Sequence, residues 1–110
     1  MEYDISDSIM KERGYELHHT NGIGCVRSYN KHFDMNGEAI GLMDAVNPIT
    51  INAEVDTLSQ TVKLSYITER MFSTLHTPDF SFDHKGFRKY ESCLVFYAAL
   101  LHVNDPLAQE

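Results

Sequence analysis

Apolar and polar residues alternate through the middle of the chain, which is the pattern of strands that bury one face. Over residues 49–56 every second residue is apolar, and residues 61–68 repeat the pattern with Val62, Leu64 and Tyr66 on one side. The two segments are separated by the turn-forming sequence DTLSQ. The alternation therefore predicts two antiparallel strands that share one buried face.

A further alternating segment covers residues 15–20 and is followed by an Asn-Gly pair at 21–22. That pair is typical of a two-residue type I′ hairpin, because both central residues need a positive φ. We therefore predict strands over 15–20 and 23–33, joined by a tight turn. The cross-strand partners expected in that register are Thr20 with Ile23, His18 with Cys25, Leu17 with Val26 and Glu16 with Arg27.

The segments on either side of the central strands are less regular. The sequence DMNG at 34–37 predicts a turn, and a third strand is predicted over 38–43. A short helix is the alternative there, although Gly41 disfavours it. After the central strands, residues 69–86 show neither period, so we expect a connection with one helical turn near 69–75.

Helical periodicity marks the two ends of the chain. Residues 4–13 place Ile5 and Ile9 one turn apart, and Gly14 is positioned to end a short helix. Apolar residues also recur at intervals of three and four over residues 86–102, which predicts a longer helix. Its expected stripe contains Phe87, Tyr90, Leu94, Tyr97 and Leu101, widened by Cys93, Phe96 and Leu100.

Together these elements predict one α+β domain over residues 1–110, in which an antiparallel meander of four or five strands carries both helices on one face. Beyond Ser92 the last helix reads CLVFYAALLH, with scarcely a polar residue on any face. A helix on one sheet buries only part of its circumference. We therefore expect the N-terminal helix or a second copy of the chain to cover the rest. The residues expected in the core or in a homodimer contact are Tyr90, Leu94, Tyr97 and Leu101.

The chain is acidic, with 9 Lys and Arg against 16 Asp and Glu and a formal net charge of -7. This balance disfavours direct binding of DNA or RNA. Between Lys31 and Lys63 there is no Lys or Arg, so we expect an acidic surface that binds a basic surface of a partner protein. A merely solvated face is the alternative. The residues of this predicted surface are Asp34, Glu38, Asp44, Glu54 and Asp56.

The two cysteines, Cys25 and Cys93, show no CxxC spacing and lie in apolar surroundings. A reducing cytoplasm is the simplest interpretation. The N-terminal residues lack the basic and apolar regions of a signal peptide, and no apolar run approaches the length of a membrane span. We therefore expect a cytoplasmic protein that does not enter a membrane.

The segment HTPDFSFDHKGFRKY at 76–90 gathers the residues most able to carry chemistry. Imidazole and carboxylate groups are ligands for zinc, manganese or iron(II), but no HExxH-like spacing places two of them on one helical face. We favour a structural interpretation in which Pro78 and Asp79 shape a turn and Asp83 caps the last helix. The alternative metal site would consist of His76, Asp79, Asp83 and His84. A secondary basic patch, able to meet an anionic group or to pair with Glu91, consists of Lys85, Arg88 and Lys89.

Motifs for nucleotide binding and for nucleophilic or carboxylate catalysis are absent from the sequence, so we predict no cofactor and no catalytic activity. Small acidic α+β proteins include accessory and inhibitory factors of phages and mobile elements, some of which act as DNA mimics in the cleft of a defence nuclease. The leading hypothesis is an interaction protein, self-associating as a homodimer, that docks its acidic face on a basic partner. A small metal-dependent enzyme and a structural subunit of a larger assembly are the alternatives.

Overall fold

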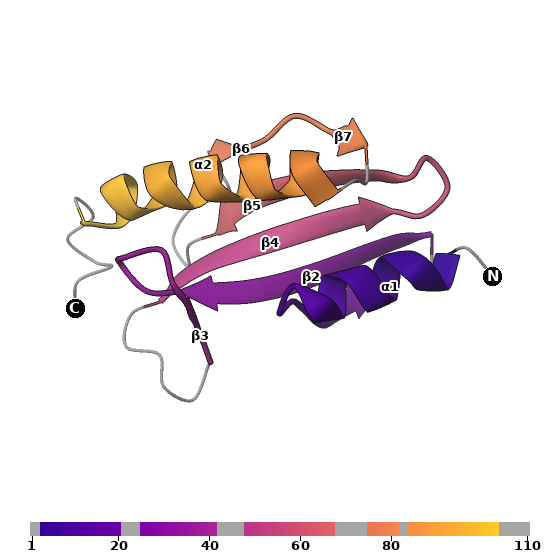
Figure 1. Cartoon of the computed structure of the whole chain (residues 1–110), viewed down its shortest axis with the longest axis horizontal. Helices are drawn as coiled ribbons and strands as arrows, with labels where there is room; N and C mark the ends of the chain where they lie inside the picture. Colours follow the sequence, from indigo (N-terminus) through magenta and orange to yellow (C-terminus); the bar gives the residue numbers. More distant parts are fainter. Residues whose placement is uncertain (1–2, 21–24, 42–47, 68–74, 82–83, 104–110) are drawn as a thin grey trace.

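The computed structural model of the chain describes residues 3–20, 25–41, 48–67, 75–81 and 84–103 (Figure 1). This part of the chain contains two helices and seven strands. In chain order the elements are α1 (Tyr3–Glu12), β1 (Glu16–Thr20), β2 (Val26–Phe33), β3 (Ala39–Ile40), β4 (Ile49–Asp56), β5 (Thr61–Ile67), β6 (Leu75–His76), β7 (Phe80–Ser81) and α2 (His84–Val103).

The strands form one antiparallel sheet in the order β1-β2-β4-β5-β6. Its centre is made by β2, β4 and β5, in which Ala53 pairs with Tyr29 on one side and with Leu64 on the other. Both β1 and β3 pair with the edge of β2 that faces away from β4, and β6 and β7 pair with the outer edge of β5. The long strands therefore lie inside the sheet, and the shorter ones form its two edges.

The core lies between the sheet and α2, which runs over β4 and β5 (Figure 1). In β4 and β5 every second side chain is buried, as the alternation in the sequence predicts. Full burial of one such aliphatic side chain contributes about 1.5 to 3 kcal/mol to stability. The largest fully buried side chains are Tyr15, Tyr29, Phe87, Met10, Ile49, Ile51, Leu64, Val55 and Val62.

The helix α1 ends at a glycine, as predicted. Gly14 has a φ of 87°, and the amide of Tyr15 donates a hydrogen bond to the carbonyl of Met10 at 3.0 Å, as in a Schellman cap. On either side of Gly14, the Arg13 guanidinium lies over the ring of Phe87, 4.6 Å from its centroid, and the Tyr15 ring meets Phe87 edge-on at 5.7 Å. The end of α1 is therefore held beside the first turn of α2, on the same face of the sheet.

The predicted α+β class is confirmed, with an antiparallel sheet and with a short N-terminal and a long C-terminal helix. The boundaries of β4 agree with the predicted strand, and β5 covers 61–67 of the predicted 61–68, with residue 68 outside the described residues. The last helix begins at His84 and is not apolar along its whole length, because Arg88, Lys89 and Glu91 lie in its first half.

The register predicted for the first hairpin is wrong. Thr20 pairs with Arg27, so six residues lie between the innermost paired residues instead of the predicted two, and the expected pairing of His18 with Cys25 does not form. The physical reason is that β2 pairs along all eight of its residues with β4, and this longer ladder decides which β2 side chains are buried. Residues 21–24, where the tight turn was predicted, lie outside the described residues.

The less regular segments differ from the prediction in detail. The third strand, predicted over 38–43, is confined in the described residues to Ala39–Ile40, and residues 42–47 lie outside them. Of the helical turn predicted near 69–75, only Leu75 is described, and it belongs to β6. Neither β6 nor β7 was predicted, because a strand of two residues is too short to show periodicity.

Candidate functional site

The outward side of α2 carries four large apolar side chains that remain exposed. Phe96, Tyr97, Leu100 and Leu101 are 61%, 56%, 51% and 46% exposed, respectively. The rings of Phe96 and Tyr97 pack edge to face with their centroids 5.4 Å apart. We call these four residues the apolar strip. Exposed apolar side chains gathered in one patch are typical of an interaction site.

A different side of α2 faces the sheet. Leu94, Val95 and Ala98 are buried, and His102, also buried, places its Nδ1 atom 2.7 Å from the hydroxyl of Tyr66 in β5. The spacing of three and four residues along this side is that of one helical face. Of the four residues expected in the core or in a dimer contact, Leu94 lies in the core, Tyr90 packs partly buried against it, and Tyr97 and Leu101 belong to the apolar strip.

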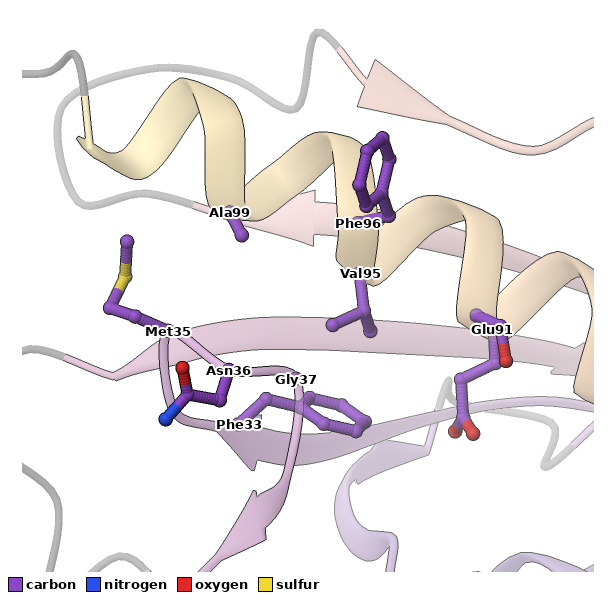
Figure 2. Close-up of a pocket in the computed structure, with 9 residues that line it drawn as sticks. Phe33, Met35, Asn36, Gly37, Glu91, Val95, Phe96 and Ala99 are labelled. Carbon is purple, nitrogen blue, oxygen red and sulfur yellow. The ribbon is translucent and has the colours of Figure 1, made fainter.

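A groove of about 270 Å³ lies beside the apolar strip, between α2 and the turn that joins β2 to β3. Figure 2 shows Val95 and Ala99 on the α2 side of the groove and Met35 on the opposite side. Phe96 and Met35 form an exposed rim, whereas Phe33 and Val95 are buried beneath it. The groove is lined by Phe33, Met35, Asn36, Gly37, Glu91, Ser92, Val95, Phe96 and Ala99.

The wall of the groove opposite α2 is held in shape by an aspartate. The Oδ1 atom of Asp34 accepts hydrogen bonds from the amides of Asn36 at 2.8 Å and Glu38 at 3.0 Å. Gly37 occupies this turn with a φ of 82°, and a Cβ atom there would lie 3.6 Å from Cγ1 of Val95. Asp34, predicted as a partner-binding residue, therefore has a structural role in the turn.

A largely buried charged cluster closes one end of the groove. The Tyr15 hydroxyl donates a hydrogen bond of 2.6 Å to Oε2 of Glu91, and the same oxygen lies 3.9 Å from Nζ of Lys31. The ammonium of Lys31 also lies 5.4 Å from the ring centroid of Tyr15 and 5.0 Å from that of Phe33. Burial, followed by the charge of Glu91 and the hydrogen bond to it, raises the pKa of Tyr15 well above 10. The phenol therefore remains a proton donor, and the cluster ties β2 to α2.

The predicted acidic residues lie at two ends of the sheet instead of in one patch. Glu54 and Asp56 alternate with buried residues of β4, so they belong to the face that points away from the helices. Asp34 and Glu38 lie at the β2–β3 turn, at the other end of β2. At about 3.4 Å per residue, the length of β2 separates the two pairs by roughly 20 to 25 Å. Asp44 lies outside the described residues.

The face of the sheet opposite α2 is mostly polar and internally hydrogen-bonded. The amide nitrogen of Asn52 lies 3.0 Å from both Oγ of Ser28 and Oδ1 of Asn30. On the same face Nδ1 of His32 lies 3.0 Å from Oγ1 of Thr50. Neither α1 nor α2 covers this face, which we call the open face. It includes Ser28, Asn30, His32, Thr50, Asn52, Glu54, Asp56 and Lys63.

The segment at 76–90, which contains His76 and His84, assembles no metal site within the part of the chain that the structure describes. No group of three or more His, Cys, Asp or Glu residues there is placed to hold a metal ion. His76 is exposed, with its Nδ1 atom 3.0 Å from the carbonyl of Thr77, and Asp79 is exposed. Asp83 and the side chain of His84 lie outside the description, so the predicted four-residue site stays an untested prediction.

The predicted basic patch is described only in part. Arg88 and Lys89 are exposed on the first half of α2, and the side chain of Lys85 lies outside the description. Glu91, considered above as a partner of Arg88, forms its closest interaction with Tyr15. The exposed cations therefore border the apolar strip on its N-terminal side.

No protein-family model, curated protein or solved structure matches this chain. Among the described residues, no helix combines the length and the apolar character needed to cross a bilayer. Cys25 and Cys93 are not joined in a disulfide, and Cys93 is exposed close to the apolar strip. The candidate functional surfaces are therefore the apolar strip with its groove and, on the opposite side of the sheet, the open face.

Proposed function

We propose that this chain is an interaction protein without catalytic activity, which binds a basic surface of a partner protein through its open face. The observation that supports this proposal most directly is a sheet face that α1 and α2 leave uncovered and that carries carboxylates. The formal net charge of -7 adds a long-range attraction between this protein and a basic partner.

The local geometry of the open face suits binding to a broad polar surface. Asn52 in β4 forms hydrogen bonds with Ser28 and Asn30 in β2. The His32–Thr50 hydrogen bond connects the same two strands further along. Because these side chains already have hydrogen-bond partners, little side-chain entropy is lost when a partner binds. Glu54 and Asp56 then supply the charge, which Lys63, paired across from Glu54, offsets only in part.

The class of partner follows from this chemistry. Basic surfaces wide enough to cover a sheet face are typical of proteins that bind nucleic acids. We therefore place this chain among small accessory or inhibitory factors of the phage or mobile-element type, which occupy a nucleic-acid-binding surface of their target. That Cys25 and Cys93 are not joined in a disulfide supports a reducing, cytoplasmic setting for this activity.

The double variant Glu54→Gln and Asp56→Asn should weaken partner binding roughly tenfold, because each exposed charge pair contributes up to about 1 kcal/mol. Asparagine keeps a side-chain oxygen at position 56, where Oδ1 of Asp56 accepts hydrogen bonds from the amides of Leu58 and Ser59. The β4–β5 turn should therefore survive the substitution. The measurement is capture of proteins from a lysate of the native host by the immobilised chain, over a series of salt concentrations.

A control is Glu12→Gln on α1, which removes one negative charge, half of what the double variant removes, from an exposed position away from the open face. The protein captured by the wild type should be retained by this control, and it should be lost from the wild type as salt increases. If the double variant captures that protein as well as the wild type does, with an unchanged salt dependence, the open face is not the binding surface.

A further inference from the structure

The apolar strip exposes an area comparable to the core of a protein interface. A fully exposed side chain of this size contributes about 150 to 250 Å². At the exposed fractions observed, the strip together with Met35, which is 41% exposed, presents roughly 500 Å² of surface. A stable interface buries about 800 Å² on each partner, with an apolar centre and a polar rim. The strip matches the apolar centre of such an interface. The polar rim would be formed by residues beside the strip, namely Lys89, Ser92 and Asn36.

The strip and the groove lie side by side on one surface, which is the arrangement that a two-fold contact requires. In such a contact the same surface of each copy must supply both the projecting and the receiving parts. Phe96 projects at the rim of the groove, and Phe33, Val95 and Ala99 line the hollow beside it (Figure 2). Phe96 of one copy and the groove of another are therefore suited to each other.

The charges near the strip do not oppose contact with a second copy. The strip itself is uncharged, and Arg88 and Lys89 lie on its N-terminal side. If two α2 helices packed antiparallel around Tyr97, the two Lys89 residues would lie roughly 24 Å apart along the axis. That separation is well beyond the screening length of about 8 Å at physiological salt. Glu54 and Asp56 lie on the far face of the sheet, so they oppose the contact little.

We infer that the apolar strip is the contact surface of a two-fold homodimer, in which the α2 helices pack antiparallel and Phe96 of each copy enters the groove of the other. This contact lies on the opposite side of the molecule from the open face. A homodimer would therefore present two open faces to its partners. The inference does not depend on the proposed binding of a basic protein, and either can fail without the other.

Sedimentation equilibrium over a range of concentrations tests the homodimer. The wild type should reach twice its chain mass of 12.6 kDa, and Leu100→Glu should raise the dimer dissociation constant at least 100-fold. Leu58→Glu is the matched control, since Leu58 is 78% exposed at the β4–β5 turn and far from the strip. It should dimerise like the wild type, and circular dichroism should show all three proteins folded. If Leu100→Glu does not fold, Phe96→Ser provides the same test.

Cross-linking through Cys93 identifies the surface that is used. In a Cys25→Ser background, the two Cys93 residues of an antiparallel pair centred on Tyr97 would lie roughly 12 Å apart along the axis. A bismaleimide with a spacer of that length should therefore cross-link two chains in which the apolar strip is unchanged. It should not cross-link chains that also carry Leu100→Glu. A wild-type chain that stays monomeric at every concentration overturns the inference. A folded Leu100→Glu protein that still dimerises overturns it as well.

Discussion

Replacing Leu94 with aspartate should abolish the folded state of this protein. Leu94 is 4% exposed and lies in the core between α2 and the sheet. The substitution removes about 1.5 to 3 kcal/mol of apolar burial and places a carboxylate where water cannot reach it, which costs several kcal/mol more. Because domains of this kind are stable by about 5 to 15 kcal/mol, a loss above about 5 kcal/mol should unfold the chain. Circular dichroism and urea titration measure the outcome.

The matched control for this substitution is Leu100→Asp, six residues further along the same helix. Leu100 is 51% exposed in the single chain, so aspartate there remains in water when both variants are measured at a concentration too low for dimers. Its cost should be about 1 kcal/mol, from the lower helix propensity of aspartate and its position near the negative end of α2. Equal destabilisation at positions 94 and 100 would mean that α2 does not turn the side containing Leu94 to the sheet.

A second large loss of stability is expected when the charged cluster beside the groove, formed by Tyr15, Lys31 and Glu91, is disrupted. Replacing Glu91 with leucine removes both the acceptor of the Tyr15 hydrogen bond and the carboxylate that lies 3.9 Å from Nζ of Lys31. The side chains of Lys31 and Glu91 are 14% and 17% exposed, so water compensates little for the loss. Removing one member of a buried pair costs about 3 to 5 kcal/mol, and we expect about 2 to 4 kcal/mol for this partly exposed one. Chemical denaturation gives the value.

The triple variant Tyr15→Phe, Lys31→Met and Glu91→Leu separates the charge effect from packing. Replacing a whole buried ionic group with apolar residues of similar size is often close to neutral. The triple variant should therefore recover most of the stability that Glu91→Leu loses. A single variant that costs less than about 1 kcal/mol would mean instead that the cluster is solvated like an ordinary surface pair.

The central strands could be predicted from the sequence because their chemistry is local. Residues of β4 and β5 alternate between the core and the open face, so the period of two is present in the sequence itself. The first hairpin could not be predicted in the same way. The Asn-Gly signal favours a two-residue turn, but the ladder between β2 and β4 fixes the register over eight pairs and overrides it.

The buried side of α2 was only partly predictable, because burial there does not follow side-chain size. The sequence favours the large residues Tyr97 and Leu101 as a buried stripe, whereas the structure turns Val95 and Ala98 to the sheet. Small side chains let the helix approach the sheet closely enough to exclude voids. His102 is buried among them because it shares a hydrogen bond with the hydroxyl of Tyr66, and that partner is 36 residues away.

The positions of the acidic residues were also only partly predictable from the sequence. Composition predicts the net charge, and the absence of Lys and Arg between Lys31 and Lys63 predicts an acidic segment. Only strand pairing shows that Asp34 and Glu38 lie at one end of β2 and that Glu54 and Asp56 lie at the other. The carboxylate of Asp34 is also engaged by its own turn, which no spacing in the sequence indicates.

Both proposed surfaces depend on the orientation of α2, and thiol labelling at low protein concentration tests that orientation most directly. Native Cys93 is exposed, whereas Val95, two residues later, is 5% exposed. In a Cys25→Ser background, Cys93 should react with a maleimide almost as fast as in denaturant. A Val95→Cys thiol, in a protein that also carries Cys93→Ser, should react at least 100-fold more slowly. Equal labelling rates at the two positions would contradict the proposed arrangement of helix and sheet.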